Sequence, residues 1–65
     1  MERGTVKFYD ESKHFGFIAQ PTGSDIFFHQ SNLSKGYTPK TSDQVKFDIG
    51  EGKKGPVAEN VCLAD

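Results

Sequence analysis

The sequence predicts an all-β fold, a small closed barrel of five short antiparallel strands, on three observations. A chain of 65 residues has room for one small domain. Its apolar residues fall into five short runs, rich in β-branched and aromatic side chains and separated by turn-forming residues. Five short strands would leave exposed edges unless the sheet closes on itself, so a barrel is the favoured arrangement. We therefore expect residues 1–65 to form a single domain.

The first half of the chain predicts a three-stranded meander. Residues 5–9 are mostly β-branched or aromatic and stop at the polar residues 10–13, as a strand entering a hairpin loop does. Residues 15–20 form the next strand. A Pro and a Gly within residues 21–25 predict a turn, after which residues 26–29 form the third strand.

The middle of the chain predicts a loop followed by a fourth strand. Residues 31–44 show no periodic apolar pattern, so we expect an ordered loop with one helical turn at residues 31–33. Val45, Phe47 and Ile49 then alternate with polar residues. This period of two predicts a strand with one buried face and one face in water.

The last segment predicts a hairpin that ends in an irregular strand. Residues 50–56 are rich in glycine and lysine and are expected to form a flexible tip. Residues 57–63 form the fifth strand. Glu59 has the same parity as Val57 and Val61, so a bulge or a twisted edge is expected there.

The net charge and the single cysteine exclude several classes of protein. A net charge of −1 excludes the strongly basic field that draws duplex DNA to a protein, so any nucleic-acid binding must depend on local geometry. Cys62 has no partner for an intramolecular disulfide. No apolar run is long enough for a signal peptide or a membrane helix, and we therefore expect a cytoplasmic protein with no membrane association.

The sequence indicates no enzyme. Ser31 and Ser34 lie near His29, but no acidic residue is placed to orient the histidine for a catalytic triad. His14, His29 and Cys62 lack the spacing of zinc ligands. We therefore expect no catalytic residue, no metal and no cofactor.

The second and third predicted strands are apolar on both faces, whereas a barrel has only one interior. The interior is predicted to contain one set of side chains, Val6, Ile18, Ile26, Phe28, Val45, Phe47, Ile49 and Val61. The other set then faces outward and consists of Phe15, Phe17, Phe27 and His29. A contiguous exposed aromatic cluster on a small protein marks a binding site, although each of these rings taken alone would be assigned to the core.

Lysines near this cluster favour single-stranded nucleic acid as the ligand. Every base has a π-face that stacks on an aromatic ring, and nearby cations neutralise phosphates. Lys7 lies on the first strand, Lys13 at the first hairpin, and Lys53 and Lys54 at the last hairpin. The face of strands two and three and the loops beside it are the contact surfaces of five-stranded oligonucleotide-binding barrels.

Two motifs give the chain a family resemblance. Residues 13–18, Lys-His-Phe-Gly-Phe-Ile, resemble the first ribonucleoprotein motif of bacterial cold-shock proteins, Lys-Gly-Phe-Gly-Phe-Ile. Residues 26–29, Ile-Phe-Phe-His, resemble the second, Val-Phe-Val-His-Phe, and residues 4–7 and 55–61 are also similar to the family. The resemblance implies a Greek-key barrel of the oligonucleotide-binding fold, a cold-shock domain. It also implies binding to pyrimidine-rich single-stranded RNA and DNA, with a role as an RNA chaperone or antiterminator in a cold-shock-type response.

The resemblance also implies a set of ligand-binding residues: Lys7, Phe8, Lys13, Phe15, Phe17, Asp25, Phe27, His29, Tyr37 and Lys54. Those that would stack bases are Phe15, Phe17, Phe27 and His29. The three lysines of the set would contact phosphates or base edges, and Asp25 would accept hydrogen bonds from the Watson–Crick edge of a base. Further candidates are Tyr9, Asp10, His14, Gln30 and Lys53.

The chain departs from the family pattern at several of these positions. Phe8, Tyr9 and Asp10 stand where the family usually has Trp-Phe-Asn, His14 stands where glycine is usual, and Gln30 replaces an aromatic residue. Phe8 and Gln30 predict weaker stacking, while strict alternation would place Phe8 inside, on the same face as Val6.

A different class of function is compatible with the same aromatic face. It would make the chain a protein-interaction or self-associating module with weak nucleic-acid binding. We expect a monomer, with a strand-exchanged dimer as the alternative.

Overall fold

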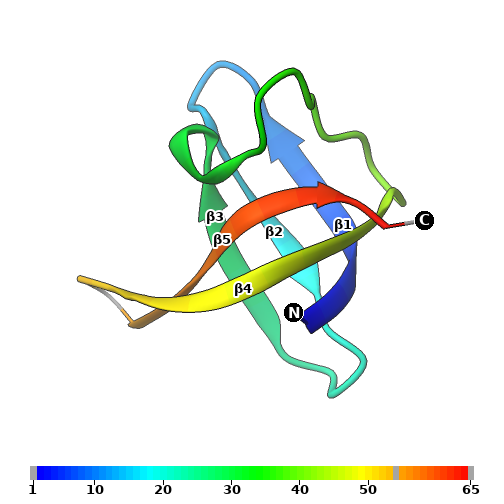
Figure 1. Ribbon diagram of the computed structural model, residues 1–65, viewed down its shortest axis with the longest axis vertical. Coiled ribbons are helices and arrows are strands. Elements are labelled where there is room, and N and C mark those ends of the chain that lie inside the picture. Colours follow the sequence, from blue (N-terminus) through cyan, green and yellow to red (C-terminus); the bar gives the residue numbers. More distant parts are fainter. Residues whose placement is uncertain (1, 54, 65) are drawn as a thin grey trace.

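The protein folds into a closed five-stranded barrel, described by a computed structural model that covers residues 2–53 and 55–64 (Figure 1). The elements are β1 (Glu2–Asp10), β2 (Phe15–Ala19), β3 (Asp25–His29), a 3₁₀ turn η1 (Gln30–Asn32), β4 (Gln44–Gly52) and β5 (Gly55–Leu63). The strands follow the order β1-β2-β3-β5-β4, and β4 pairs with β1 to close the barrel. The all-β barrel predicted from the sequence is confirmed.

The strand order is that of a Greek key, with β4 returning to lie beside β1 of the β1-β2-β3 meander. Four of the five pairings are antiparallel. The pairing of β3 with β5 is parallel and is limited to Phe27 opposite Val57, so the all-antiparallel prediction is wrong at this seam. The helical turn expected at residues 31–33 forms one residue earlier, at Gln30–Asn32.

The interior contains eight apolar side chains that are almost completely removed from water: Val6, Ile18, Ile26, Phe28, Val45, Phe47, Ala58 and Val61. Seven of them were expected there. Ile49 was also expected inside, but it is 50% exposed, and Ala58, which pairs with it across the hairpin, is buried instead. Ile49 lies on the β4–β5 hairpin, whose end projects beyond the rest of the barrel (Figure 1). The strands also continue to Gly52 and resume at Gly55, so the expected flexible tip is shorter than residues 50–56.

A bulge in β1 decides which way its aromatic side chains point. Val6 pairs with Ile18, but Phe8 pairs with Phe17, so Lys7 is one residue extra in β1. The bulge reverses the alternation. Val6 therefore faces the interior, whereas Phe8 turns outward and is 41% exposed. Phe8 thus lies on the face to which the family resemblance assigned it, and not on the face that strict alternation would give.

A second bulge, in β5, confirms the irregularity expected near Glu59. Lys46 pairs with Cys62 and Asp48 with Glu59, so an advance of two residues along β4 corresponds to three residues along β5. Asn60 adopts a left-handed backbone conformation with φ of 54°, and its side-chain amide donates to Asp48 at 3.1 Å. The extra residue places Ala58 and Val61 in the interior although they lie three positions apart.

Gly16 allows β2 to approach its neighbours closely. A Cβ atom at this position would meet the backbone carbonyl oxygen of Phe8 and would lie 2.8 Å from the ring of Phe28. Both contacts are tighter than side chains tolerate. The glycine between the two outward phenylalanines of β2 therefore lets the barrel close beneath them.

Candidate nucleic-acid interface

Four phenylalanine rings form a continuous surface on the outer side of β1, β2 and β3. We name this surface the aromatic platform; its members are Phe8, Phe15, Phe17 and Phe27. Phe17 lies at its centre, with ring centroids 5.4 Å from Phe8, 6.2 Å from Phe15 and 5.8 Å from Phe27. Phe15 and Phe27 lie 5.6 Å apart. All four rings are partly exposed to solvent.

The strand pairing explains why these rings gather outside the barrel. Phe17 pairs with Phe27 and Phe15 with His29, so the outward side chains of β2 and β3 form cross-strand pairs. The alternate side chains of both strands fill the interior. Aromatic pairs of this kind contribute about 0.5–1.5 kcal/mol each beyond their buried area, which holds the rings in place while their faces stay accessible.

The β4–β5 hairpin borders the platform and makes one side of it concave. The groove between them has a volume of about 700 Å³ and is lined by Phe15, Phe17, Phe27, Lys53, Gly55, Pro56 and Val57. Lys53 thus lies in the same groove as three rings of the platform. Pro56 and Val57 were not assigned to the interface from the sequence, because nothing in the alternation shows that the hairpin lies beside β2 and β3. Lys54 lies outside the described residues.

Lys7 and Asp25 form an ion pair with each other. The Lys7 ammonium lies 2.8 Å from Asp25 Oδ2, and the two side chains are 57% and 39% exposed. Asp25 has the same parity on β3 as Phe27, so the pair lies on the outer side of the barrel with the platform. An exposed pair of this kind is worth about 0.2–1 kcal/mol. A ligand that uses either group must compete with this weak interaction.

His29 has a fixed tautomer at one end of the platform. Its Nδ1 atom accepts a hydrogen bond from the backbone N–H of Ser31 at 3.1 Å and lies 3.1 Å from the Ser31 hydroxyl. A neutral ring that accepts at Nδ1 carries its proton on Nε2. The exposed imidazole therefore offers a ring face and an N–H donor beside Phe15.

The turn between β1 and β2 is held by Asp10. Its Oδ1 atom accepts from the hydroxyl and backbone N–H of Ser12 at 2.6 and 3.0 Å and from the backbone N–H of Lys13 at 3.2 Å. The hydroxyl of Ser12 contributes most to a pKa of the Asp10 carboxyl below its ordinary value. Asp10 is thus engaged in the turn, whereas Lys13 and His14 are exposed at it.

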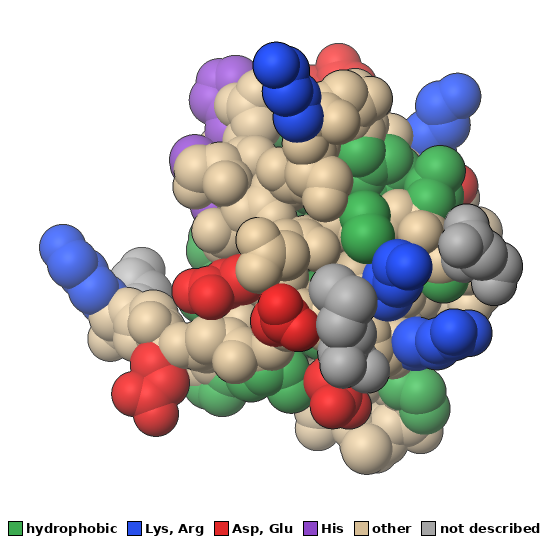
Figure 2. All heavy atoms as spheres, viewed as in Figure 1, with side chains coloured by type: hydrophobic (Ala, Val, Ile, Leu, Met, Phe, Trp, Pro, Cys, Tyr) green, Lys and Arg blue, Asp and Glu red, His purple; other side chains and the backbone are tan. Residues whose placement is uncertain are grey.

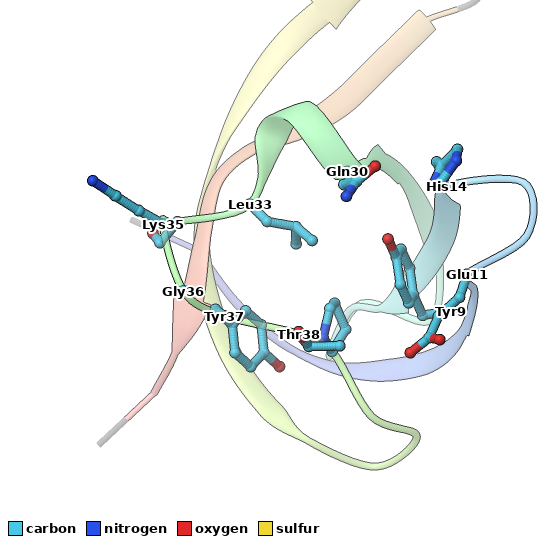
Figure 3. Close-up of a pocket in the computed structure, with 11 residues that line it drawn as sticks. Tyr9, Glu11, His14, Gln30, Leu33, Lys35, Gly36, Tyr37 and Thr38 are labelled. Atoms are coloured by element: carbon cyan, nitrogen blue, oxygen red, sulfur yellow. The ribbon is translucent and has the colours of Figure 1, made fainter.

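Tyr9, His14, Gln30 and Tyr37 lie away from the platform in a second cavity. We name it the loop pocket, after the β1–β2 turn and the loop following η1 that enclose it (Figure 3). It has a volume of about 520 Å³ and is lined by Tyr9, Glu11, His14, Gln30, Leu33, Ser34, Lys35, Gly36, Tyr37, Thr38 and Pro39. Glu11, Leu33 and Thr38 could not be assigned to one site from the sequence, because Glu11 belongs to a segment far from the other two in the chain.

The two tyrosines of the loop pocket are both held by the protein. The Tyr9 ring stacks on buried Phe28, with centroids 5.8 Å apart and planes at 11°. The Tyr37 hydroxyl donates to Asp43 Oδ2 at 2.9 Å. Partial burial, reinforced by that hydrogen bond, raises the pKa of the Tyr37 hydroxyl well above its ordinary value. Tyr37 is therefore not part of the aromatic platform in the free protein.

The acidic side chains of β4 and β5 make that side of the molecule unfavourable for a phosphate backbone. Figure 2 shows acidic side chains over the β4–β5 side of the molecule, to which Asp48, Glu51 and Glu59 belong. No group of His, Cys, Asp and Glu suited to a metal ion occurs among residues 2–53 and 55–64. Within the same residues, no helix is long and apolar enough to cross a bilayer.

A five-stranded Greek-key barrel with exposed aromatic rings on β1, β2 and β3 defines the class of small oligonucleotide-binding barrels. The chain matches the family model of the 'Cold-shock' DNA-binding domain over residues 2–64 and belongs to that family. Members of this family are nucleic-acid-binding proteins and not enzymes.

Known proteins similar to the chain agree with this assignment. It is 50% identical to cold shock protein ScoF of Streptomyces coelicolor, over 98% of this chain and all of the relative. It is 46% identical to a cold shock-like protein of Thermotoga maritima, over 97% and 98% of the two chains. A solved structure described as Drosophila Unr CSD456 superposes with a TM-score of 0.80 at 21% identity, over 98% of this chain and 26% of that one. This structural likeness supports the fold.

Proposed function

We propose that this nucleic-acid-binding protein stacks the bases of pyrimidine-rich single-stranded RNA and DNA on its aromatic platform. The observation that carries the proposal is the continuity of four partly exposed rings on one outer face. Small proteins do not leave such a surface to water without a binding role. His29 extends it by a fifth flat ring at the end of β3.

The expected affinity follows from the number of rings. Stacking contributes about 1–3 kcal/mol per base, so three stacked bases supply roughly 3–9 kcal/mol. The upper part of this range corresponds to a Kd of about 1 μM. A preference for pyrimidines would then arise from backbone flexibility and stacking geometry rather than from base-edge hydrogen bonds.

The lysines supply a smaller electrostatic contribution. Lys7, Lys13 and Lys53 are exposed, and we propose that they meet phosphates, with Lys54 as a further contact. Three contacts to a single strand give a slope of log K against log salt of about −2. This slope is shallow because only about three phosphates are neutralised, as suits a protein with a net charge of −1.

Binding of this kind gives the protein a cellular role as an RNA chaperone. A base that stacks on the platform is unpaired, so the protein shifts the equilibrium of an RNA hairpin toward its open form. Opening a terminator hairpin would produce transcription antitermination. We propose this activity for a monomer in the cytoplasm, as part of a cold-shock-type response.

The test compares single strands with duplex. A fluorescein-labelled oligothymidine is titrated with the protein and followed by anisotropy, and a labelled duplex of equal length is measured in parallel. Stacking predicts binding of the single strand and at least tenfold weaker binding of the duplex. Equal affinity for both would contradict the proposal.

The same sample distinguishes self-association by the aromatic face. Light scattering with and without oligothymidine should show one copy in both states. A dimer that dissociates when oligothymidine is added would show that the face also mediates protein contacts. A dimer that blocks binding would overturn the proposal in favour of an interaction module.

A further inference from the structure

The loop pocket is a second cavity, and the proposed stacking of bases on the platform does not involve it. Its volume of about 520 Å³ falls within the range of cavities that bind small molecules. Leu33 points into it (Figure 3), and the lining also includes buried Pro39, which supplies further apolar surface. The pocket therefore has the dimensions and the partly apolar walls that a flat ring requires.

Three polar groups around the pocket have no hydrogen-bond partner within the part of the chain that the structure describes. Neither the Tyr9 hydroxyl, the Glu11 carboxylate nor the Gln30 side-chain amide has a hydrogen-bond partner among residues 2–53 and 55–64. The Tyr9 hydroxyl points into the pocket from a ring fixed by Phe28, and Gln30 lies across from it (Figure 3). By contrast, the Tyr37 hydroxyl is already satisfied by Asp43.

The pocket begins where the platform ends. Gln30 directly follows His29, and its backbone N–H donates to the carbonyl oxygen of His14 at 2.8 Å, which joins the two walls of the pocket. Phe15 pairs with His29 at the near edge. A strand that stacks along the platform and continues past His29 therefore reaches this cavity.

We propose that the loop pocket takes one guanine base of the strand that stacks on the platform. The Glu11 carboxylate would accept from guanine N1–H and N2–H₂, and the Gln30 amide lies across the pocket for the remaining edge. The inference rests on the proposed function, because the platform delivers the strand.

The charge of Glu11 selects the base. A carboxylate is an acceptor only, and it binds most strongly where two donors lie side by side. Guanine alone among the four bases presents two adjacent donors on its Watson–Crick edge. Thymine and uracil place a carbonyl oxygen on each side of their single N–H, and adenine and cytosine place a ring acceptor beside their amino group. Lys35 extends away from the opening and does not neutralise Glu11 (Figure 3).

The experiment compares labelled hexamers. Hexathymidine is measured against two hexamers in which guanine replaces thymine at the 5′ or the 3′ end, because the structure does not set the strand direction. One of the two should bind about 5-fold or more tightly than hexathymidine, the lower end of what a bidentate contact discriminates. Inosine, which lacks the N2 amino group, should lose most of this preference.

Glu11→Gln tests the assigned group, with Glu2→Gln as the matched control. Both variants remove one exposed carboxylate, but Glu2 lies at the start of β1 and is not part of the pocket. A uniform effect of charge cancels in the ratio of guanine-containing hexamer to hexathymidine. This ratio should fall to about 1 in Glu11→Gln and stay unchanged in Glu2→Gln.

The possible results distinguish failure of the guanine site from failure of base stacking on the platform. Equal affinity for all the hexamers, or a ratio that survives Glu11→Gln, would overturn the guanine site while leaving stacking intact. Failure of hexathymidine to bind would overturn the proposed function itself. Free guanosine that bound as tightly as the hexamer would assign the pocket to a nucleoside and overturn its role in strand recognition.

Discussion

Removing the central ring of the aromatic platform should weaken binding far more than it weakens folding. Phe17 contacts three other rings of the platform, at centroid distances of 5.4 to 6.2 Å, yet it is only half-buried. Phe17→Ala deletes one stacking surface, which costs about 1–3 kcal/mol and raises the Kd about 5- to 150-fold. Its partial exposure keeps the loss of folding stability below the 3–5 kcal/mol of a fully buried Phe→Ala change.

The control for this prediction lies on the neighbouring strand. Phe28 is fully buried and belongs to the interior beneath the platform. Phe28→Leu should lower the free energy of unfolding by about 1–2 kcal/mol while leaving oligothymidine affinity nearly unchanged. Anisotropy of labelled oligothymidine and urea denaturation measure the two quantities on the same preparations.

A second variant keeps the test decisive if Phe17→Ala folds poorly. Phe17→Leu keeps the apolar bulk but removes the π-face, so affinity should fall while the unfolding midpoint changes little. Unchanged affinity in Phe17→Leu would refute stacking on this ring. A larger loss of stability than in Phe28→Leu would show that Phe17 is a core residue.

Three further predictions concern the surroundings of the platform. The ion pair between Lys7 and Asp25 is weak, so Lys7 can exchange it for a phosphate contact when oligothymidine binds. Lys7→Gln should therefore make the salt slope of binding shallower by about 0.7. An unchanged slope would show that Lys7 stays paired with Asp25 in the complex and contacts no phosphate. The pKa of the Asp10 carboxyl is lowered in the folded protein, so the ionised carboxylate stabilises the fold. This stabilisation is complete above the unfolded-state pKa of about 4, and it is lost as the pH falls through the folded-state pKa. The difference in urea stability between wild type and Asp10→Asn should therefore be constant from about pH 5 to 8 and shrink below about pH 4, and a difference that persists at pH 2 would contradict it. His14 has a φ of 63°, so His14→Gly should raise the free energy of unfolding by about 0.5–1 kcal/mol, and destabilisation in urea would show that the histidine is not strained.

Alternation and turn chemistry predicted the fold because each strand is short and bounded by clear breakers. The two-faced pattern of β2 and β3 was sufficient to separate interior from platform, since Ile18 and Phe28 are buried while Phe17 and Phe27 are not. The same rule failed for Phe8. A one-residue bulge at Lys7 inverts the alternation, and a bulge depends on pairing with another strand rather than on local sequence.

Ile49 shows a second limit of the pattern. Its parity matches that of Val45 and Phe47, but alternation shows which face a residue occupies and not how far the barrel extends along the strand. The contact between Lys7 and Asp25 could not be predicted from the sequence for a related reason. Each residue was predicted to face the ligand, and only the register of three strands shows that they face each other.

The most direct test of base stacking on the platform is a titration of ¹⁵N-labelled protein with oligothymidine, followed by amide chemical shifts. We predict saturable shifts that centre on Phe15, Phe17, Phe27 and His29, with smaller changes at Lys7 and Lys53. Binding that leaves these amides unshifted, or shifts confined to the acidic β4–β5 side, would contradict the aromatic platform as the interface.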